Sequence, residues 1–282
     1  GVLMKLQYLG TAAAEAIPAV FCHCDTCRRA REAGGKDIRG RSGLVVDDTA
    51  LIDFPPDIYM TSLRFGIDLG NIRDIFVTHS HGDHFDMEEL GMRLNGVFCH
   101  LGEHDDAPGI QVYGNDGVAR VAKAYAGSNS TEFMTFTETR FGGRYRAENG
   151  TVFTFLPARH MESENSGFYM LESAAGDKRA LYAHDTGVFP EETYRLLEGK
   201  RFDLISLDCC FGRLSGGISG HMGLPENRQT VARLRQMGCV DERTVIVIHH
   251  FSHNCGQLQK ELEREVAEDR YLVAYDGMTL TI

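Results

Sequence analysis

Short apolar stretches recur along the chain, and several of them end directly in histidine or aspartate. Residues 75–77 are β-branched or aromatic and lead into residues 78–84, which hold three histidines and one aspartate. Apolar runs of this length, bounded by polar residues, are typical of buried strands. The same order, a strand followed by candidate ligands, recurs at residues 151–160, 179–185 and 244–250. The polar residues at these strand ends are therefore the first candidates for a functional site.

The hydrophobic pattern also predicts further strands and helices. Residues 97–109, which include His100, His104, Asp105 and Asp106, are interpreted as a solvated loop without a site role, and residues 127–149 are polar and weakly patterned. Without a repeat or a linker, a single domain over residues 1–282 is expected. Further strands are expected at residues 2–8, 44–47, 50–54, 110–113, 166–171, 202–207, 271–274 and 278–282, and helices at residues 58–64, 86–94, 115–125, 190–197 and 257–267.

Composition and charge narrow the class of protein. The chain has 282 residues, 43% of them hydrophobic and 24% charged, as expected of a globular protein with a substantial core. No apolar run is long enough to cross a membrane, and residues 2–8 suit a first strand better than a secretory signal. The net charge of −11 argues against a large nucleic-acid footprint, because such binding relies on Lys and Arg. A small anion held by metal ions remains compatible.

The spacing of residues 78–84 suits two metal ions. His79 and His81 are two apart, so on an extended chain they share one face and can bind one ion. Gly82 would permit a sharp turn that carries Asp83 and His84 towards a second ion. The alternative is a polar loop that holds three histidines by chance. Four ligand-type side chains at one strand end are difficult to explain by packing, so the metal interpretation is favoured.

A second metal site is indicated by Cys22, Cys24 and Cys27. Three thiols in six residues can all face one tetrahedral ion, and zinc is the ion most often bound in this way. Free thiols in a redox loop are the alternative. Because disulfides are rare in the cytosol, the pattern favours a cytoplasmic metal-binding protein. His250 and His253 are three apart and can diverge to two different ions, so His253 offers the cysteine loop a fourth ligand.

Other candidate residues follow the later strands. His160 lies at a strand end, and the carboxylate of Asp185 has two oxygens with which to bridge two ions. His221 lies in a glycine-rich loop, residues 216–223, and could move with that loop as a general acid, although a surface histidine is the plain alternative. Asp53 is a candidate for supporting the ligands, whereas Asp57 is interpreted as a helix N-cap. Cys209 and Cys210 are interpreted as small buried residues.

Taken in chain order, these residues resemble the signature of the metallo-β-lactamase superfamily. The resemblance implies an α/β fold, a four-layer αβ/βα sandwich with two divalent metals at the edge of the sheets. It also favours Asp185 over its neighbour His184, because in the family pattern the aspartate is followed by Thr and Gly. The implied metal ligands are His79, His81, Asp83, His84, His160, Asp185 and His250.

The cysteine loop narrows the resemblance to the phosphoribosyl cyclic phosphodiesterases of the carbon–phosphorus lyase pathway, although it also occurs in the pyrroloquinoline quinone biosynthesis protein B group. The match implies a structural zinc on Cys22, Cys24, Cys27 and His253. It also implies hydrolysis of a small cyclic phosphodiester by a hydroxide that bridges two zinc or manganese ions, with Asp83 and His221 as catalytic residues. A homodimer is compatible with this resemblance. The alternatives are a ribonuclease Z-like tRNA processing nuclease and a non-hydrolytic member.

Overall fold

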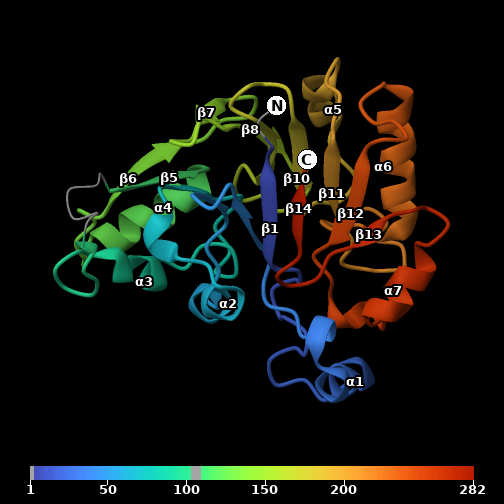
Figure 1. Cartoon of the computed structure of the whole chain (residues 1–282), viewed down its shortest axis with the longest axis horizontal. Helices are drawn as coiled ribbons and strands as arrows, with labels where there is room; N and C mark the ends of the chain where they lie inside the picture. The colour runs from blue at the N-terminus through green and yellow to red at the C-terminus, as the bar shows by residue number, and fades with distance from the viewer. Residues whose placement is uncertain (1–2, 103–108) are drawn as a thin grey trace.

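The protein is described by a computed structural model that covers residues 3–102 and 109–282. Two β-sheets face each other, and helices cover their outer surfaces (Figure 1). In the described residues each sheet has seven strands. In spatial order the first sheet consists of β14 (Thr279–Thr281), β1 (Lys5–Gly10), β2 (Gly43–Val46), β3 (Ala50–Ile52), β4 (Asp74–Phe76), β5 (Ile110–Gly114) and β6 (Met134–Glu138).

The second sheet lies against the first, with its strands contributed mainly by the second half of the chain. In spatial order it consists of β13 (Leu272–Val273), β12 (Val245–His249), β11 (Leu204–Asp208), β10 (Arg179–Ala183), β9 (Gly167–Glu172), β8 (Val152–Pro157) and β7 (Arg144–Arg146). The α-helices are α1 (Asp25–Ala33), α2 (Ile58–Phe65), α3 (Met87–Leu90), α4 (Asp116–Ala126), α5 (Glu191–Leu197), α6 (Leu224–Gln236) and α7 (Gln259–Glu265).

The hydrophobic core lies in three layers that follow from the strand patterns. Alternate residues of a strand face opposite sides, so each sheet buries one face against the other sheet and one against helices. Between the sheets, Leu6 and Phe76 pack with Phe153 and Tyr169. A second cluster joins the first sheet to α2, α3 and α4, and a third joins the second sheet to α5 and α6. The predicted four-layer αβ/βα sandwich is therefore confirmed.

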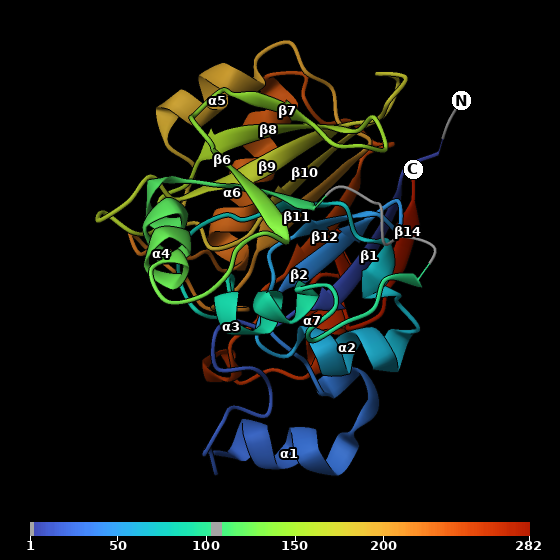
Figure 2. The same cartoon turned by 90° about the vertical axis from the view of Figure 1, so that its left-hand side faces the viewer.

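Parallel strands gather the polar strand ends at one edge of the sandwich. The neighbours β3, β4 and β5 are parallel, and so are β10, β11 and β12. Because parallel strands end at the same edge of a sheet, the residues that follow β4, β10, β11 and β12 lie close together. Away from the sheets, α1 projects from one end of the molecule (Figure 2).

Several expected elements differ from the structure. The predicted helix at residues 86–94 is shorter, because α3 passes into a 3-10 turn at Gly91–Arg93. Residues 127–149 contain the strands β6 and β7, whose residues are mostly exposed or half-buried, so they lack the apolar alternation of a core strand. The polar helix α6 was not expected either. His104, Asp105 and Asp106 lie outside the described residues.

Hydrogen bonding and burial confirm two further predictions, the start of a helix at Asn115 and the burial of two cysteines. The side chain of Asn115 accepts a hydrogen bond from Val118 N (2.9 Å), as an N-cap does. Cys209 and Cys210 are buried free thiols, as expected. No helix in the described parts of the chain is both long and apolar enough to cross a membrane.

Candidate metal-binding active site

The loop after β4 brings its histidines and aspartate to the edge where the two sheets meet. Two carboxylates hold this loop. Asp53, which follows β3, accepts hydrogen bonds from Thr78 N (2.8 Å) and Thr78 Oγ1. Glu164 accepts one from Ser80 N (3.0 Å) and one from the side chain of Asn115 (2.8 Å). The start of the loop is therefore anchored at Thr78 and Ser80, which limits how far the candidate ligands beside these residues can move.

One group of candidate ligands is formed by His79, His81, His160 and Asp185. His79 Nε2 lies 2.9 Å from His81 Nδ1, and His160 Nε2 lies 3.5 Å from that same nitrogen. Asp185 Oδ1 is 3.6 Å from His160 Nε2, and Asp185 Oδ2 is 4.0 Å from His79 Nε2. Three histidines from two separate segments thus present nitrogen atoms to one point, and Asp185 lies beside two of them.

A second group lies beside the first and shares Asp185 with it. Asp83 Oδ2 is 2.9 Å from His84 Nε2, and His250 Nε2 is 3.0 Å from Asp185 Oδ1. His84 Nε2 is also in contact with Asp185 Oδ2. Asp185 therefore stands between the two groups, and each of its oxygens lies near one member of each group. The structure brings together all seven residues that were predicted as metal ligands, while their metal-binding role stays a prediction.

The donor set fits divalent cations. Imidazole nitrogens and carboxylate oxygens are the ligands that zinc and related transition metals bind. His84 Nε2 and Asp185 Oδ2 touch each other, yet in the described structure neither is paired in a hydrogen bond. Buried polar atoms without a well-formed hydrogen bond need another partner, and a divalent cation would supply one.

The pKa shifts of His84 and Asp185 also indicate a site for a divalent cation. His84 is buried, and burial alone would lower its pKa, but the carboxylates of Asp83, Asp185 and Asp53 outweigh burial and raise the pKa well above its ordinary value. Burial also opposes ionisation of Asp185, yet the neighbouring His250 and His84 hold its pKa well below the usual range. Three carboxylates around one buried imidazole concentrate negative charge that a bound cation would offset.

Several candidate ligands are oriented by hydrogen bonds to the ring nitrogen that faces away from the site. Asp53 Oδ2 accepts from His84 Nδ1 (2.6 Å) and from His184 Nε2 (2.7 Å), and Ser42 Oγ is 2.7 Å from His250 Nδ1. Such outer contacts hold a ligating ring in one tautomer and orientation. Asp53 and His250 also have positive φ angles of 65° and 63°, which are uncommon for residues other than glycine.

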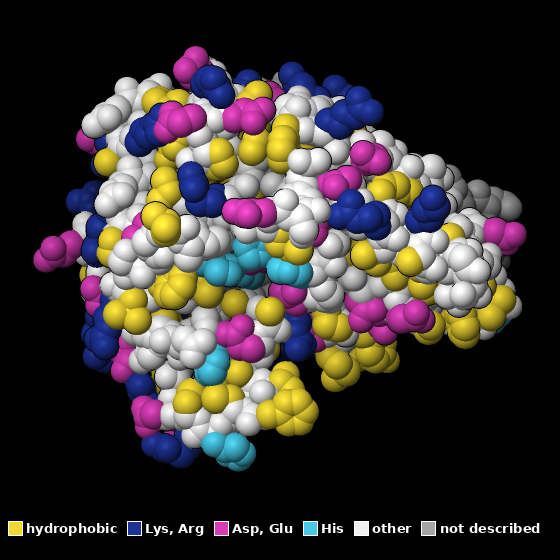
Figure 3. Space-filling view, turned by 180° about the vertical axis from the view of Figure 1, so that it is seen from behind, with side chains coloured by type: hydrophobic (Ala, Val, Ile, Leu, Met, Phe, Trp, Pro, Cys, Tyr) yellow, Lys and Arg dark blue, Asp and Glu magenta, His cyan; other side chains and the backbone are white. Residues whose placement is uncertain are grey.

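His221 lies at the rim of the same site. Its Nδ1 donates to Asp208 Oδ2 (2.9 Å), at the end of β11. Burial alone would lower the pKa of His221, but the charge and hydrogen bond of Asp208 raise it to about 9. A cavity of about 260 Å³ is lined by His221 together with five of the candidate ligands, His81, Asp83, His160, Asp185 and His250. Figure 3 shows histidine side chains gathered in a hollow of this face.

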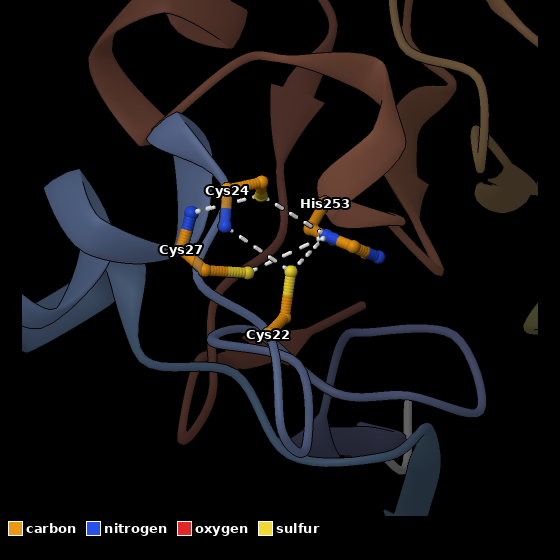
Figure 4. Close-up of side chains that lie close together, drawn as sticks. All are labelled: Cys22, Cys24, Cys27 and His253. Atoms are coloured by element: carbon orange, nitrogen blue, oxygen red, sulfur yellow. Dashed lines mark hydrogen bonds between the residues drawn. The ribbon is translucent and has the colours of Figure 1, made fainter.

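The cysteine loop forms a separate cluster with the turn that follows β12. His253 Nδ1 lies 3.5 Å from Cys22 Sγ, 3.3 Å from Cys24 Sγ and 3.4 Å from Cys27 Sγ (Figure 4). A tetrahedral zinc bound by sulfur and nitrogen would place these atoms about 3.5 Å apart. The hydrogen bond to His253 lowers the pKa of Cys24 to about 6. The residues present therefore fit a structural zinc, as the sequence predicts.

Two local expectations were wrong, and a loop that was expected to move is held by hydrogen bonds near its ends. Gly82 has no positive φ, and a Cβ at this position would meet nothing within 4 Å, so the turn does not require glycine. Asp57 is the first residue before α2, but its side chain accepts from Arg41 N (3.0 Å) instead of capping the helix. The loop around His221 looks flexible in the sequence, yet Glu226 accepts from Gly216 N (2.9 Å) and Gly223 N (2.8 Å) and holds it.

Sequence reasoning missed two carboxylates that support the site, Asp208 and Glu164. It also assigned no role to several other histidines. Asp208 ends a buried strand, the same signal that identified His160, so the pattern alone could have assigned it to the site. Glu164 carries no such signal, because it reaches the site from a turn. His249 is buried with its Nδ1 2.9 Å from Ser206 Oγ, outside both groups of ligands, and His100 is exposed.

Comparisons with solved structures place this fold among known proteins. A diphosphatase of the PhnP family is 22% identical with a TM-score of 0.75, over 100% of this chain and 98% of that one. Zinc-bound PqqB from Methylobacterium extorquens is 18% identical, also with a TM-score of 0.75, over 98% and 99% of the two chains. The short form of human tRNase Z is 17% identical with a TM-score of 0.61, over 98% of each chain. At these identities the likeness shows the fold.

A curated sequence relative, the octanoyltransferase of Porphyromonas gingivalis (strain ATCC BAA-308 / W83), is 34% identical over 85 residues. This match covers 29% of the chain and 16% of that protein, so the chain spans about a sixth of its length. Residues 49–250, most of the chain, match the family model of the beta-lactamase superfamily domain. The four-layer fold and the clustered histidines and aspartates agree with this match. The protein therefore belongs to the metallo-β-lactamase superfamily, as predicted.

Proposed function

We propose that the protein is a metal-dependent hydrolase that cleaves small phosphodiesters, cyclic ones included. One observation carries the proposal: two groups of histidine and aspartate ligands share Asp185 on the floor of a single cavity, and His221 stands at the rim of that cavity. When bound, two divalent cations would stabilise negative charge on phosphoryl oxygens and lower the pKa of water. Zinc and manganese both suit this donor set.

The ligand roles follow from the geometry. His79, His81 and His160 would hold one cation, and Asp83, His84 and His250 the other, with Asp185 between them. Asp83 is half-buried and lines the cavity, so its carboxylate can also accept a hydrogen bond from an attacking water and orient it.

His221 is suited to donate a proton. Its raised pKa keeps the ring protonated at neutral pH, and Asp208 holds Nδ1, which leaves Nε2 free to act as a donor. A phosphodiester needs this proton because its leaving oxygen departs as an alkoxide unless it is protonated. The formal charge of −11 favours a small substrate over tRNA.

A substrate panel tests the proposal. We expect protein loaded with zinc or manganese to hydrolyse bis-(p-nitrophenyl) phosphate, a 2′,3′-cyclic nucleotide or a ribose cyclic phosphate, and to lose this activity on chelation. Inactivity on all three with metals bound would contradict the proposal, and cleavage of precursor tRNA alone would favour a ribonuclease Z-like nuclease. Metal analysis showing less than one bound transition metal per chain would also overturn it.

The role of His221 is tested by a substitution. His221→Ala should lower kcat by about 10²–10⁴-fold, the usual contribution of a general acid, without changing metal content. Glu32→Gln, an exposed change on α1, serves as the control. Full activity of His221→Ala would show that the proton comes from another group.

A further inference from the structure

Part of the cavity wall is formed by residues other than the candidate metal ligands. There its wall is formed by Glu15 from the loop after β1, Phe211 from the loop after β11 and Asn254 from the turn after β12. None of the described residues that line the cavity is Lys or Arg. A substrate with its phosphoryl group at the histidines therefore extends towards a carboxylate, an amide and an aromatic ring.

Glu15 is held in place by contacts through one oxygen. Glu15 Oε1 accepts a hydrogen bond from Ser252 Oγ and lies 3.7 Å from His253 Nε2. The loop itself is fixed to the same turn, since Ala13 N donates to Phe251 O (2.9 Å). In the described structure both side-chain contacts of Glu15 use Oε1, so Oε2 is available to a ligand. The side chain keeps 31% of its surface exposed, which allows that ligand to reach it.

Among the described residues, no Lys or Arg forms an ion pair with Glu15, whose one ion-pair contact is with His253. Arg41 approaches the same loop, but its Nε donates to Ala14 O (2.8 Å) and its Nη1 lies 3.8 Å from Asp57. An anionic group in this part of the cavity would meet Glu15 without compensation, whereas a hydroxyl or an amine would donate a hydrogen bond to it.

From this arrangement we infer that Glu15 is a specificity-determining residue that selects a phosphate ester whose far end is a hydrogen-bond donor and carries no second anion. Phe211 provides an apolar surface for the body of that ester, and Asn254 a further polar contact. The inference rests on the proposed function in placing the phosphoryl group at the histidine cluster. It makes the proposed function more specific, because it excludes diphosphates and other esters with two anionic groups from the substrate class.

A series of phenyl phosphates that differ only at the para position tests this inference. The probes are phenyl phosphate, 4-(hydroxymethyl)phenyl phosphate, 4-(aminomethyl)phenyl phosphate and 4-carboxyphenyl phosphate, titrated calorimetrically into manganese-loaded protein. We expect the hydroxymethyl and aminomethyl esters to bind more tightly than phenyl phosphate, and the carboxy ester to bind about tenfold more weakly than the hydroxymethyl ester, as one uncompensated like charge would cause. The hydroxymethyl and aminomethyl probes separate neutral from cationic donors.

The matched variants are Glu15→Gln and Glu32→Gln. Glu15→Gln removes the charge and keeps an oxygen for Ser252, so it should bring the affinities of the carboxy and hydroxymethyl esters at least fivefold closer together. Glu32→Gln, the same change on an exposed face of α1, should leave the ratio unaltered. The melting temperature and metal content of each variant establish that it is folded and loaded.

Two results would overturn the inference: equal binding of the carboxy and hydroxymethyl esters to the wild-type protein, or an unchanged ratio in a folded Glu15→Gln variant. Because the wild-type ranking is decisive by itself, the test stands even if the variant fails to fold. Binding is measured without turnover. A protein that shows the expected ranking but hydrolyses no phosphodiester would refute the proposed function and leave the selection by Glu15 intact.

Discussion

Asp53 shows how much of this site depends on single buried side chains. It is fully buried, and its carboxylate accepts hydrogen bonds from Thr78, His84 and His184. Burial alone would raise the pKa of Asp53, but the two histidines outweigh burial and hold the pKa well below its ordinary value. One carboxylate thus anchors the ligand loop and fixes the orientation of a candidate ligand.

Replacing Asp53 by Asn should destabilise the metal-free protein. At pH 7 we expect the free energy of unfolding to fall by about 3 kcal/mol or more, because buried donors lose a charged acceptor. The folded pKa of Asp53 is depressed, so its stabilisation is complete above about pH 5 and is lost as the pH falls below about 4. Urea unfolding at pH 7, 5, 4 and 3 should therefore show the same difference between the two proteins at pH 7 and 5, and a shrinking difference below about pH 4. A difference that does not change with pH would contradict this account.

Asp208 should control the pH range of activity through His221. Its carboxylate raises the pKa of His221 to about 9, so in the wild-type protein the acid is lost only as the pH rises through that value. Asp208→Asn removes this charge and should move the alkaline limb of the kcat profile to lower pH. An unmoved limb, measured with metal content unchanged, would show that another group sets it.

The loop between β11 and α6 illustrates how a polar segment becomes ordered. Glu226, in the first turn of α6, accepts hydrogen bonds from the backbone of Gly216 and Gly223. The backbone is also packed closely, since a Cβ at Gly223 would lie 1.7 Å from Leu214 O. This loop carries His221, so the order of the loop decides where the proposed acid stands.

Gly223→Ala tests this close packing. The added methyl group must displace the loop, and we expect a loss of about 1–3 kcal/mol in the free energy of unfolding together with reduced kcat. Gly82→Ala is the control, because its Cβ would meet nothing within 4 Å and its φ is not positive. Thermal unfolding and turnover of both variants check the contrast. Equal behaviour of the two variants would show that the loop adapts freely.

The cysteine cluster links distant parts of the chain. Cys24 and His253 are 229 residues apart in sequence, yet their ligand atoms lie 3.3 Å apart. The turn that carries His253 begins at His250, a candidate ligand of the active site, and Glu15 touches the same turn. A zinc ion here would clamp the first loop to the last buried strand, close to the catalytic cavity.

Removing this zinc should weaken both stability and activity. Cys24→Ala is expected to lower the zinc content by about one ion per chain, to reduce the melting temperature and to lower turnover through His250. Cys99→Ser, a thiol outside the cluster, should change none of these. Elemental analysis and thermal unfolding check the prediction, and a Cys24→Ala variant with unchanged stability and turnover would rule out the coupling.

Much of the protein could be predicted from sequence because its signals are local. Apolar runs predict strands, and ligand-type residues directly after them predict a metal site, since both depend on neighbours in the chain. This is why His79, His81, His160 and Asp185 could be named in advance, while the exposed strands β6 and β7 could not.

Only the tertiary structure decided the contacts between segments far apart in sequence. The order of apolar and polar residues along the sequence cannot reveal that Asp53 orients His84 or that Glu226 orders the loop of His221. Nor can it reveal that Glu15 lines the cavity. Each of these contacts depends on how the two sheets pack and where their parallel strands end. Sequence alone therefore determined which metal-ligand side chains the chain carries. Packing decided which other side chains orient these ligands and line the cavity beside them.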